Sequence, residues 1–220
     1  MNAEQPADQP GERQRVVLVS GLSGAGRSSI LRALEDVGFE AIDNPPTEAI
    51  EGLVADGPPE PDRRVAVGVD VRSRGFNVQA LLNVMARLKA TPGLRAELIF
   101  AWADESVLLR RFTETRRRHP LSPQGRVTDG IALEQMQTAR LRAGADLVLD
   151  TSDLSLAGLR QWIDRRFGPE AEDDPQGGLA VAVTSFAFPA GLPREADMVL
   201  DARFLRNPYY HPGLRSRTGE

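Results

Sequence analysis

The stretch VVLVSGLSGAGRSSILRALEDV, residues 16–37, decides the fold class. Its apolar start, Val16–Ser20, predicts a short buried parallel strand. The spacing of Ile30, Leu34 and Val37 then predicts a helix with one apolar face. The glycine-rich turn between them lets successive backbone N–H groups point at one anion, and the positive end of the helix faces the same place. The stretch therefore predicts a phosphate-binding loop with a nucleotide as its ligand.

The predicted ATP contacts are the eight residues of this turn: Gly21, Leu22, Ser23, Gly24, Ala25, Gly26, Arg27 and Ser28. They match the phosphate-loop pattern G-x-x-x-x-G-K-[ST], except that Arg27 stands at the lysine position. A guanidinium is a wide planar fork rather than a compact point charge, so we expect nucleotide binding with weakened hydrolysis. The alternative interpretation, a Gly/Ser linker, is disfavoured by the strand and helix predicted on either side.

Residues 15–168 alternate short apolar runs with segments of helical periodicity. This pattern predicts an α/β domain of the P-loop nucleotidase kind, with a parallel sheet and helices on both faces. The predicted strands are Val16–Ser20, Glu40–Asp43, Val65–Val71, Glu97–Ala101 and Asp146–Leu149. The predicted helices are Ser28–Val37, Thr47–Ala55, Phe76–Ala90, Ser106–Arg118, Ile131–Gly144 and Ser155–Phe167.

The two ends of the chain differ from this domain in composition. Residues 1–14 are polar and proline-bearing, which predicts a disordered N-terminus. Residues 169–178 are acidic and rich in Pro and Gly, which predicts a linker. Residues 179–220 hold two strand-like runs, Leu179–Phe188 and Met198–Phe204, but are too few for an independent core. We expect a small, apparently truncated C-terminal domain that contains β-structure.

The composition of the 220-residue chain excludes several classes of protein. Its formal net charge of −4 and its pI near 5.4 give no overall attraction for nucleic acid or an anionic membrane. The absence of cysteine excludes disulfides, thiolate zinc sites and thiol catalysis. No apolar stretch approaches the roughly 20 residues that span a bilayer, and the N-terminus lacks a signal-peptide core. We therefore expect a cytoplasmic protein with no membrane partner.

A second polar site is predicted where the apolar run that begins at Val65 ends in Asp70. An acid at this place can hold the Mg²⁺ of a bound nucleotide opposite the Ser28 hydroxyl. The following Arg72 and Ser73 place a cation and a hydroxyl nearby. The alternative is that Asp70 only begins a turn.

The segment 110–121 concentrates cations, among them Arg111, Arg116, Arg117 and Arg118. Such a run after the fourth strand can close as a lid over a phosphate or an acceptor, and it can also contact RNA phosphates. The alternative is a solvated helical face near the negative end of the helix dipole. His119, which follows the run, is expected to form a local hydrogen bond.

Several of these segments together resemble the RapZ-type family of bacterial P-loop nucleotide-binding proteins, some of whose members are RNase adapter proteins. The resemblance covers about residues 16–219. The matching segments are Gly21–Ser28, Leu31–Phe39, Asp43–Pro46, Asp70–Ser73, Arg111–Leu121, Gly191–Asp197 and Asp201–Tyr210. Three departures stand out: Arg27 replaces lysine, Ser73 replaces asparagine, and the sequence stops before the glycine-rich segment with which family members continue.

The resemblance implies ATP binding at Gly21–Ser28 and GTP binding at Asp70, Val71, Arg72 and Ser73, with ATPase and GTPase activity. Mg²⁺, expected from Ser28 and Asp70, is the predicted cofactor with either nucleotide. It also favours the lid or ligand role of the arginine run over the solvated face. A small RNA or a regulatory protein is an implied partner, and we expect a homo-oligomer.

Four functions follow from these expectations. The leading one is a nucleotide-binding regulatory protein that hydrolyses ATP and GTP slowly. The others are a small-molecule P-loop kinase, an RNA-binding adapter for an endoribonuclease, and a degenerate P-loop kept as scaffold.

Overall fold

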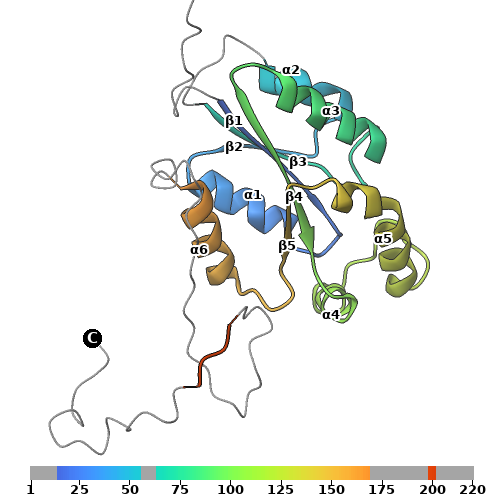
Figure 1. Cartoon of the computed structure of the whole chain (residues 1–220). Coiled ribbons are helices and arrows are strands. Elements are labelled where there is room, and N and C mark those ends of the chain that lie inside the picture. The colour runs from blue at the N-terminus through green and yellow to red at the C-terminus, as the bar shows by residue number, and fades with distance from the viewer. Residues whose placement is uncertain (1–13, 56–62, 169–197, 202–220) are drawn as a thin grey trace, which may run out of the picture. The chain divides into compact units, whose positions relative to one another are not determined.

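A five-stranded, all-parallel sheet forms the centre of the protein in a computed structural model that describes residues 14–55, 63–168 and 198–201. The strand order is β2-β3-β1-β4-β5 (Figure 1). The strands are β1 (Gln14–Gly21), β2 (Glu40–Asp43), β3 (Arg64–Gly68), β4 (Leu94–Trp102) and β5 (Leu147–Asp150). β1 pairs with β3 on one side and β4 on the other, and all eight of its residues are buried. Burial on both faces explains why its sequence is apolar without alternation.

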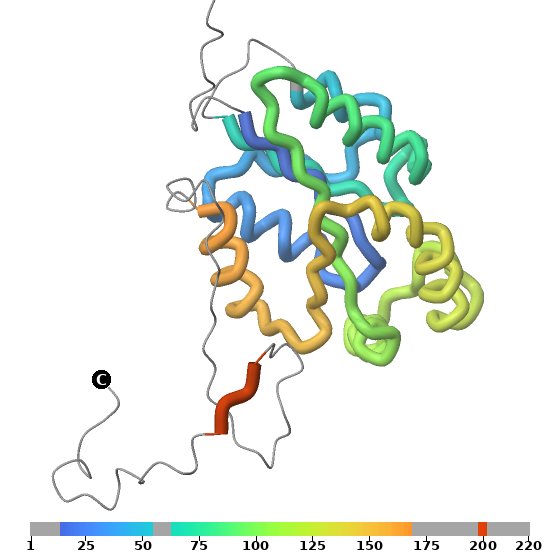
Figure 2. Tube along the Cα trace, in the orientation of Figure 1, coloured from blue at the N-terminus to red at the C-terminus, as the bar shows by residue number. Residues whose placement is uncertain are grey.

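Helices cover both faces of the sheet. They are α1 (Arg27–Asp36), α2 (Ile50–Ala55), α3 (Val78–Ala90), α4 (Glu105–Thr115), α5 (Val127–Ala143) and α6 (Leu156–Phe167), and a 3-10 turn at Thr47–Ala49 leads into α2. α1 packs beside α6 on one face, whereas α2 and α3 lie together on the other, with α5 against α3 and α4 (Figures 1 and 2). This arrangement confirms the predicted α/β fold with helices on both faces.

The topology places the functional site. The chain runs from β1 to β2 and β3 on one side and then crosses to β4 and β5 on the other, so the strand order reverses at β1. Ligands of open parallel sheets bind at such a reversal, outside the carboxyl ends of the strands. The segments that follow β1, β3 and β5 meet there, together with α4.

Two predicted elements end three residues earlier than expected. β3 stops at Gly68 rather than residue 71, because Asp70–Ser73 form a turn in which Ser73 N donates to Asp70 O and Arg72 N to Asp70 Oδ1. The helix after β4 stops at Thr115 rather than residue 118, because Arg116 adopts a left-handed conformation with φ 51° that ends it. Arg117 and Arg118 therefore lie in the segment that follows the helix.

The chain divides into two units, Met1–Gly178 and Leu179–Glu220. Gln14, expected in the disordered N-terminus, is the first residue of β1. In the second unit, the described residues 198–201 have no regular secondary structure, so the strand predicted from Met198 is absent from them. The predicted disorder of residues 1–13, the linker 169–178 and the strand Leu179–Phe188 lie outside the described residues. No helix in the described part of the chain is long and apolar enough to cross a membrane.

Candidate functional site

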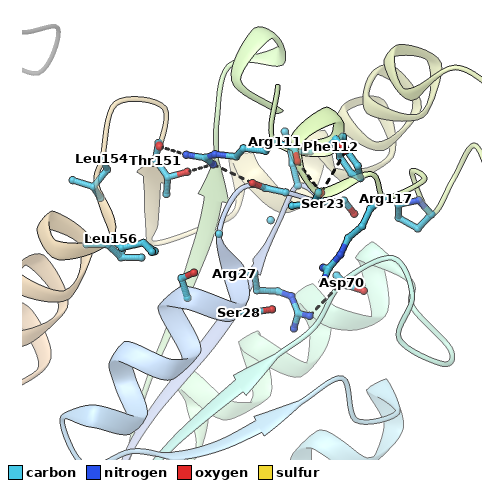
Figure 3. Close-up of a pocket in the computed structure, with 18 of the residues that line it drawn as sticks. Ser23, Arg27, Ser28, Asp70, Arg111, Phe112, Arg117, Thr151, Leu154 and Leu156 are labelled. Atoms are coloured by element: carbon cyan, nitrogen blue, oxygen red, sulfur yellow. Dashed lines mark hydrogen bonds and ion pairs between the residues drawn. The ribbon is translucent and has the colours of Figure 1, made fainter. Parts of the chain in front are cut away.

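A cavity of about 720 Å³ opens at the carboxyl ends of the strands. Its walls come from the loop after β1, the turn after β3, α4 with the segment that follows it, and the segment from the end of β5 into α6 (Figure 3). The lining residues are Gly21, Leu22, Ser23, Gly24, Gly26, Arg27, Ser28, Ser29, Asp70, Arg72, Arg111, Phe112, Thr115, Arg117, Arg118, Pro120, Thr151, Leu154, Ser155, Leu156 and Leu159.

The loop between β1 and α1 presents unpaired amides to this cavity. Gly24 and Gly26 have φ values of +88° and +93°, a region that glycine adopts without strain. Within the described residues, the N–H groups of Gly24, Gly26, Arg27 and Ser28 donate no hydrogen bond to the protein. α1 has neither a side-chain cap nor an acidic residue in its first turn. The positive end of its dipole is therefore uncompensated, as an anion site requires.

Three residues outside the loop hold it in this shape. Thr151, directly after β5, donates its hydroxyl to Ala25 O at 2.9 Å. Arg111 of α4 donates to Gly24 O at 3.0 Å and to Thr151 O at 2.6 Å (Figure 3). Glu134 of α5 accepts from Ser23 N at 2.9 Å and from Ser23 Oγ at 2.8 Å. The conformation of the loop is thus held by contacts within the protein.

Arg27 does not reach over the loop. Its side chain is 6% exposed and spans two carboxylates. Nη1 contacts Asp43 Oδ1, and Nη2 lies 3.0 Å from Asp70 Oδ2, the contact marked in Figure 3. The guanidinium fork therefore joins the ends of β2 and β3 to the first turn of α1. A lysine, with one ammonium, has no such two-pronged reach.

Asp70 is enclosed by arginines. Arg72 Nε lies 3.1 Å from both of its carboxylate oxygens, and Arg72 Nη2 lies 2.5 Å from Oδ2. Burial by itself raises the pKa of Asp70, but the Arg72 hydrogen bonds and the charges of Arg27 and Arg72 outweigh it and hold that pKa below its ordinary value. The hydrogen bond to Asp70 raises the pKa of Arg72 in turn. Both groups are charged at neutral pH.

The four residues expected to bind GTP do not act alike. Asp70 and Arg72 line the same cavity as the phosphate-binding loop, whereas Val71 and Ser73 are not among its lining residues. Ser73 is buried, and its hydroxyl accepts from Asp70 N and donates to Asn44 Oδ1 at 2.8 Å. Its role is to shape the turn.

Of the four arginines expected to form a lid, three line the cavity and one does not. Arg111, Arg117 and Arg118 line the cavity, and Arg117 extends into it from the segment after α4 (Figure 3). Arg111 is partly buried, which together with the charge of Arg110 lowers its pKa. Arg116 forms the C-cap of α4 and is not among the lining residues.

Both residues of the expected magnesium pair, Ser28 and Asp70, line the cavity. The Ser28 hydroxyl lies on the cavity wall in the first turn of α1. Asp70 instead directs its carboxylate oxygens to Arg27 and Arg72, and this geometry does not fit direct coordination of Mg²⁺. Among the residues that the structure describes, no three His, Cys, Asp or Glu side chains gather as a metal cluster.

Sequence reasoning missed Thr151, Glu134 and the apolar residues Leu154 and Leu156 on the cavity wall. Thr151 follows β5 directly, as Asp70 follows β3, and strand ends at a sheet reversal are where ligand contacts occur. Glu134 shares the buried face of α5 with Ile131, Thr138 and Leu141. A glutamate within an apolar helical stripe is a signal in the sequence, since buried carboxylates need partners.

Comparison with known proteins agrees with this geometry. Residues 14–171 match the family model described as the RapZ-like N-terminal domain, and residues 179–220 match that of the RapZ C-terminal domain. A nucleotide-binding protein of Gluconacetobacter diazotrophicus is 58% identical over 206 residues, which cover 94% of this chain and 56% of that protein. One from Rhodospirillum rubrum is 46% identical over 217 residues, which cover 99% of this chain and 66% of that one. The chain thus spans a little over half to two thirds of these relatives.

Solved structures with a similar fold are distant in sequence. A shikimate kinase from Acinetobacter baumannii, in complex with shikimate, is 15% identical with a TM-score of 0.48, covering 70% of this chain and 93% of that one. The two family models together include every residue that the structure describes, and the two nucleotide-binding relatives align with 94% and 99% of the chain. The chain therefore belongs to the RapZ family.

Proposed function

We propose that the cavity binds the triphosphate of ATP or GTP in the loop Gly21–Ser28. The observation that carries the proposal is the set of four amides, Gly24, Gly26, Arg27 and Ser28, that have no partner in the described protein and begin a helix with an uncompensated positive end. Arg27 is buried and Gly26 half-buried, and N–H groups without partners are rare at such positions, so these two call for a ligand. Gly24 and Ser28 are exposed and line the same cavity. The nucleotide-binding names of the relatives agree with this interpretation.

The proposed site takes one nucleotide at a time. Asp70 and Arg72 face the same cavity as the loop, so the two segments expected to bind ATP and GTP serve a single ligand. Leu154, Leu156 and Leu159 form an apolar wall on which a nucleobase can pack. We expect ATP and GTP to compete. Mg²⁺ enters as the counter-ion of the nucleotide, with the Ser28 hydroxyl as its ligand from the protein.

Hydrolysis at this site is proposed to be slow. The cation of the first turn, Arg27, is engaged by Asp43 and Asp70 and not by the space in front of the amides. Glu134, the carboxylate joined to the loop, is fully buried behind Ser23 and has no direct access to an attacking water. Binding without fast turnover fits a regulatory protein whose state depends on the bound nucleotide.

A matched pair of glycine variants tests the binding site. Gly26 and Gly38 both have φ +93°, and an added Cβ meets no protein atom closer than 3.9 Å at Gly26 and none within 4 Å at Gly38. Gly26→Ala and Gly38→Ala therefore carry the same backbone strain, roughly 1–2 kcal/mol, at opposite ends of α1. We expect only Gly26→Ala to weaken ATP and GTP binding in calorimetric titrations, by tenfold or more. Equal affinities for the two variants, or no binding by the unaltered protein, would refute the proposal.

A small-molecule kinase is the second candidate, because Arg72, Arg117 and Arg118 add cations to the cavity beyond the loop. Such a wall suits an anionic phosphoryl acceptor. Nucleotide turnover measured against a panel of anionic metabolites distinguishes the two functions: an acceptor that speeds turnover a hundredfold supports the kinase, and uniformly slow turnover supports the regulatory protein.

A further inference from the structure

Glu134 joins the phosphate-binding loop to the segment that carries the arginines. Its Oε1 accepts from Ser23 Oγ at 2.8 Å, and its Oε2 accepts from Ser23 N at 2.9 Å and lies 3.1 Å from His119 Nε2. Both Glu134 and His119 are fully buried. Ser23 itself lines the cavity, so a fully buried carboxylate lies one hydrogen bond away from a residue of the cavity wall.

The hydrogen bonds assign the proton on His119. Leu121 N donates to His119 Nδ1 at 3.2 Å, so Nδ1 is an acceptor and the proton of the neutral ring is on Nε2. Burial lowers the pKa of His119, which agrees with a neutral imidazole. His119 therefore donates to Glu134 Oε2, and Glu134 receives three hydrogen bonds from uncharged groups.

No cation touches the Glu134 carboxylate in the described structure. The charged groups that act on it from a distance are Asp70, which disfavours its charge, and Arg72, which favours it. Burial is the largest influence and, although the Ser23 hydrogen bonds oppose it, raises the pKa of Glu134 to about 7. The residue thus gains or loses a proton within the physiological range.

We propose that Glu134 is a positioning residue that takes up a proton when a nucleoside triphosphate binds, and thereby turns the Ser23 hydroxyl into a donor toward the ligand. While Glu134 is a carboxylate, the Ser23 O–H must point at Oε1, and only its oxygen lone pairs face the cavity. With a proton from solvent on Oε1, Glu134 donates to Ser23 Oγ, and the serine hydrogen is released toward the cavity. Oε2 continues to accept from Ser23 N and His119, so no hydrogen bond is lost.

An anionic ligand drives this change. A triphosphate places several negative charges near Glu134, and a like charge favours the protonated form. The released hydroxyl hydrogen then has a phosphate oxygen to bind. Because binding and protonation are linked, nucleotide affinity falls once the pH exceeds the pKa of Glu134 in the protein without nucleotide. The affinity falls by up to about tenfold per pH unit. The inference rests on the proposed function, because it needs a phosphate in the cavity.

Glu134→Gln imitates the protonated state. Its carbonyl oxygen can accept from Ser23 N and His119 Nε2, and its amide can donate to Ser23 Oγ. The usual result of removing a buried hydrogen-bonding carboxylate is weaker binding, because the loop loosens. Here we expect the opposite in alkaline solution: Glu134→Gln should retain the affinity that the unaltered protein loses.

The test is calorimetric titration of the full chain with MgATP at pH 6.5, 7.5 and 8.5, in two buffers of different ionisation enthalpy. The unaltered protein should take up close to one proton on binding at pH 7.5–8.5 and lose affinity about tenfold over that interval, whereas Glu134→Gln should do neither. Asp129→Asn, at an exposed carboxylate on the same helix, is the control and should match the unaltered protein. Because phosphates also titrate near pH 6, the difference between variants is the quantity that counts.

Ser23→Ala supplies a second measurement. It should weaken binding at pH 6.5, where the hydroxyl donates, and have little effect at pH 8.5. The linkage is overturned if the unaltered protein and Glu134→Gln show the same pH profile and proton uptake, or if Ser23→Ala acts equally at both pH values. Absence of nucleotide binding by every variant overturns the proposed function itself, which is a distinguishable result.

Discussion

Arg27→Lys restores the usual phosphate-loop residue, yet we expect it to destabilise the protein. The Arg27 guanidinium contacts Asp43 through one nitrogen and Asp70 through another, and a single ammonium cannot replace both contacts. The Asp43 side chain is 52% exposed, so that pair contributes at most about 1 kcal/mol. Asp70 is buried and keeps Arg72, so a weakened second contact costs roughly 1–2 kcal/mol rather than the 3–5 kcal/mol of a fully stranded charge.

The sum is about 2 kcal/mol of lost unfolding free energy, which corresponds to a melting temperature roughly 4–8 °C lower for a domain of this size. The assay is urea unfolding followed by circular dichroism, with Arg32→Lys, an exposed position on the same helix, as the control. The unfolding free energy lost through Arg27→Lys should be smaller in acid. Because the folded-state pKa of Asp70 is lowered, its stabilising contribution is complete above about pH 4 and disappears as pH falls through that lower value.

Hydrolysis provides an independent measurement on the same variant. An ammonium that is released from one carboxylate can reach the phosphates in front of the loop, so we expect Arg27→Lys to turn ATP over faster than the unaltered protein. Unfolding free energies equal within about 0.5 kcal/mol for Arg27→Lys, Arg32→Lys and the unaltered protein would show that the two-carboxylate bridge does not hold the strand ends together.

Further predictions concern the loop and its supports. The pKa of Glu134 is raised to about 7, so the folded state holds a proton that the unfolded state loses near pH 4.3. The free energy of unfolding should therefore fall by about 3 kcal/mol as pH rises from 4.5 to 7. Glu134→Gln should abolish this pH dependence in urea titrations, and an unchanged pH dependence contradicts the burial argument. Arg111→Lys removes the fork that joins the loop to Thr151, and should weaken ATP binding about tenfold in calorimetry with a melting temperature within a few degrees of normal; unaltered affinity means that the fork is dispensable. Gly21→Ala places a Cβ on the Ala101 carbonyl oxygen, a backbone atom that cannot move aside. This variant should have a melting temperature lower by 10 °C or more, or fail to fold. A native melting curve would contradict the close approach of β1 and β4.

The features that could be predicted from the sequence are those set by neighbouring residues. The continuous apolar run of β1 predicts a buried parallel strand, because both of its faces are covered and no polar residue is tolerated. The glycines at residues 24 and 26 predict a loop that needs positive φ, and both have it. The order of strands and helices follows from their alternating periodicities, but several predicted bounds differ. The turn at Asp70 and the left-handed Arg116 end β3 and α4 early, and α5 begins at Val127 rather than at residue 131.

Only the tertiary structure decided how the charged residues are used. Arg27, Asp43 and Asp70 are far apart in sequence, and no local pattern indicates that the arginine bridges both carboxylates instead of facing a phosphate. Likewise, no residue near Ser23 in the sequence indicates that Ser23 N donates a hydrogen bond to Glu134, 111 residues away. Local conformational propensities depend on residues a few bonds apart, so they can be predicted from the sequence. Side-chain pairing and pKa depend on burial and on neighbours that only folding brings within about 4 Å, and the chemistry of this cavity rests on those.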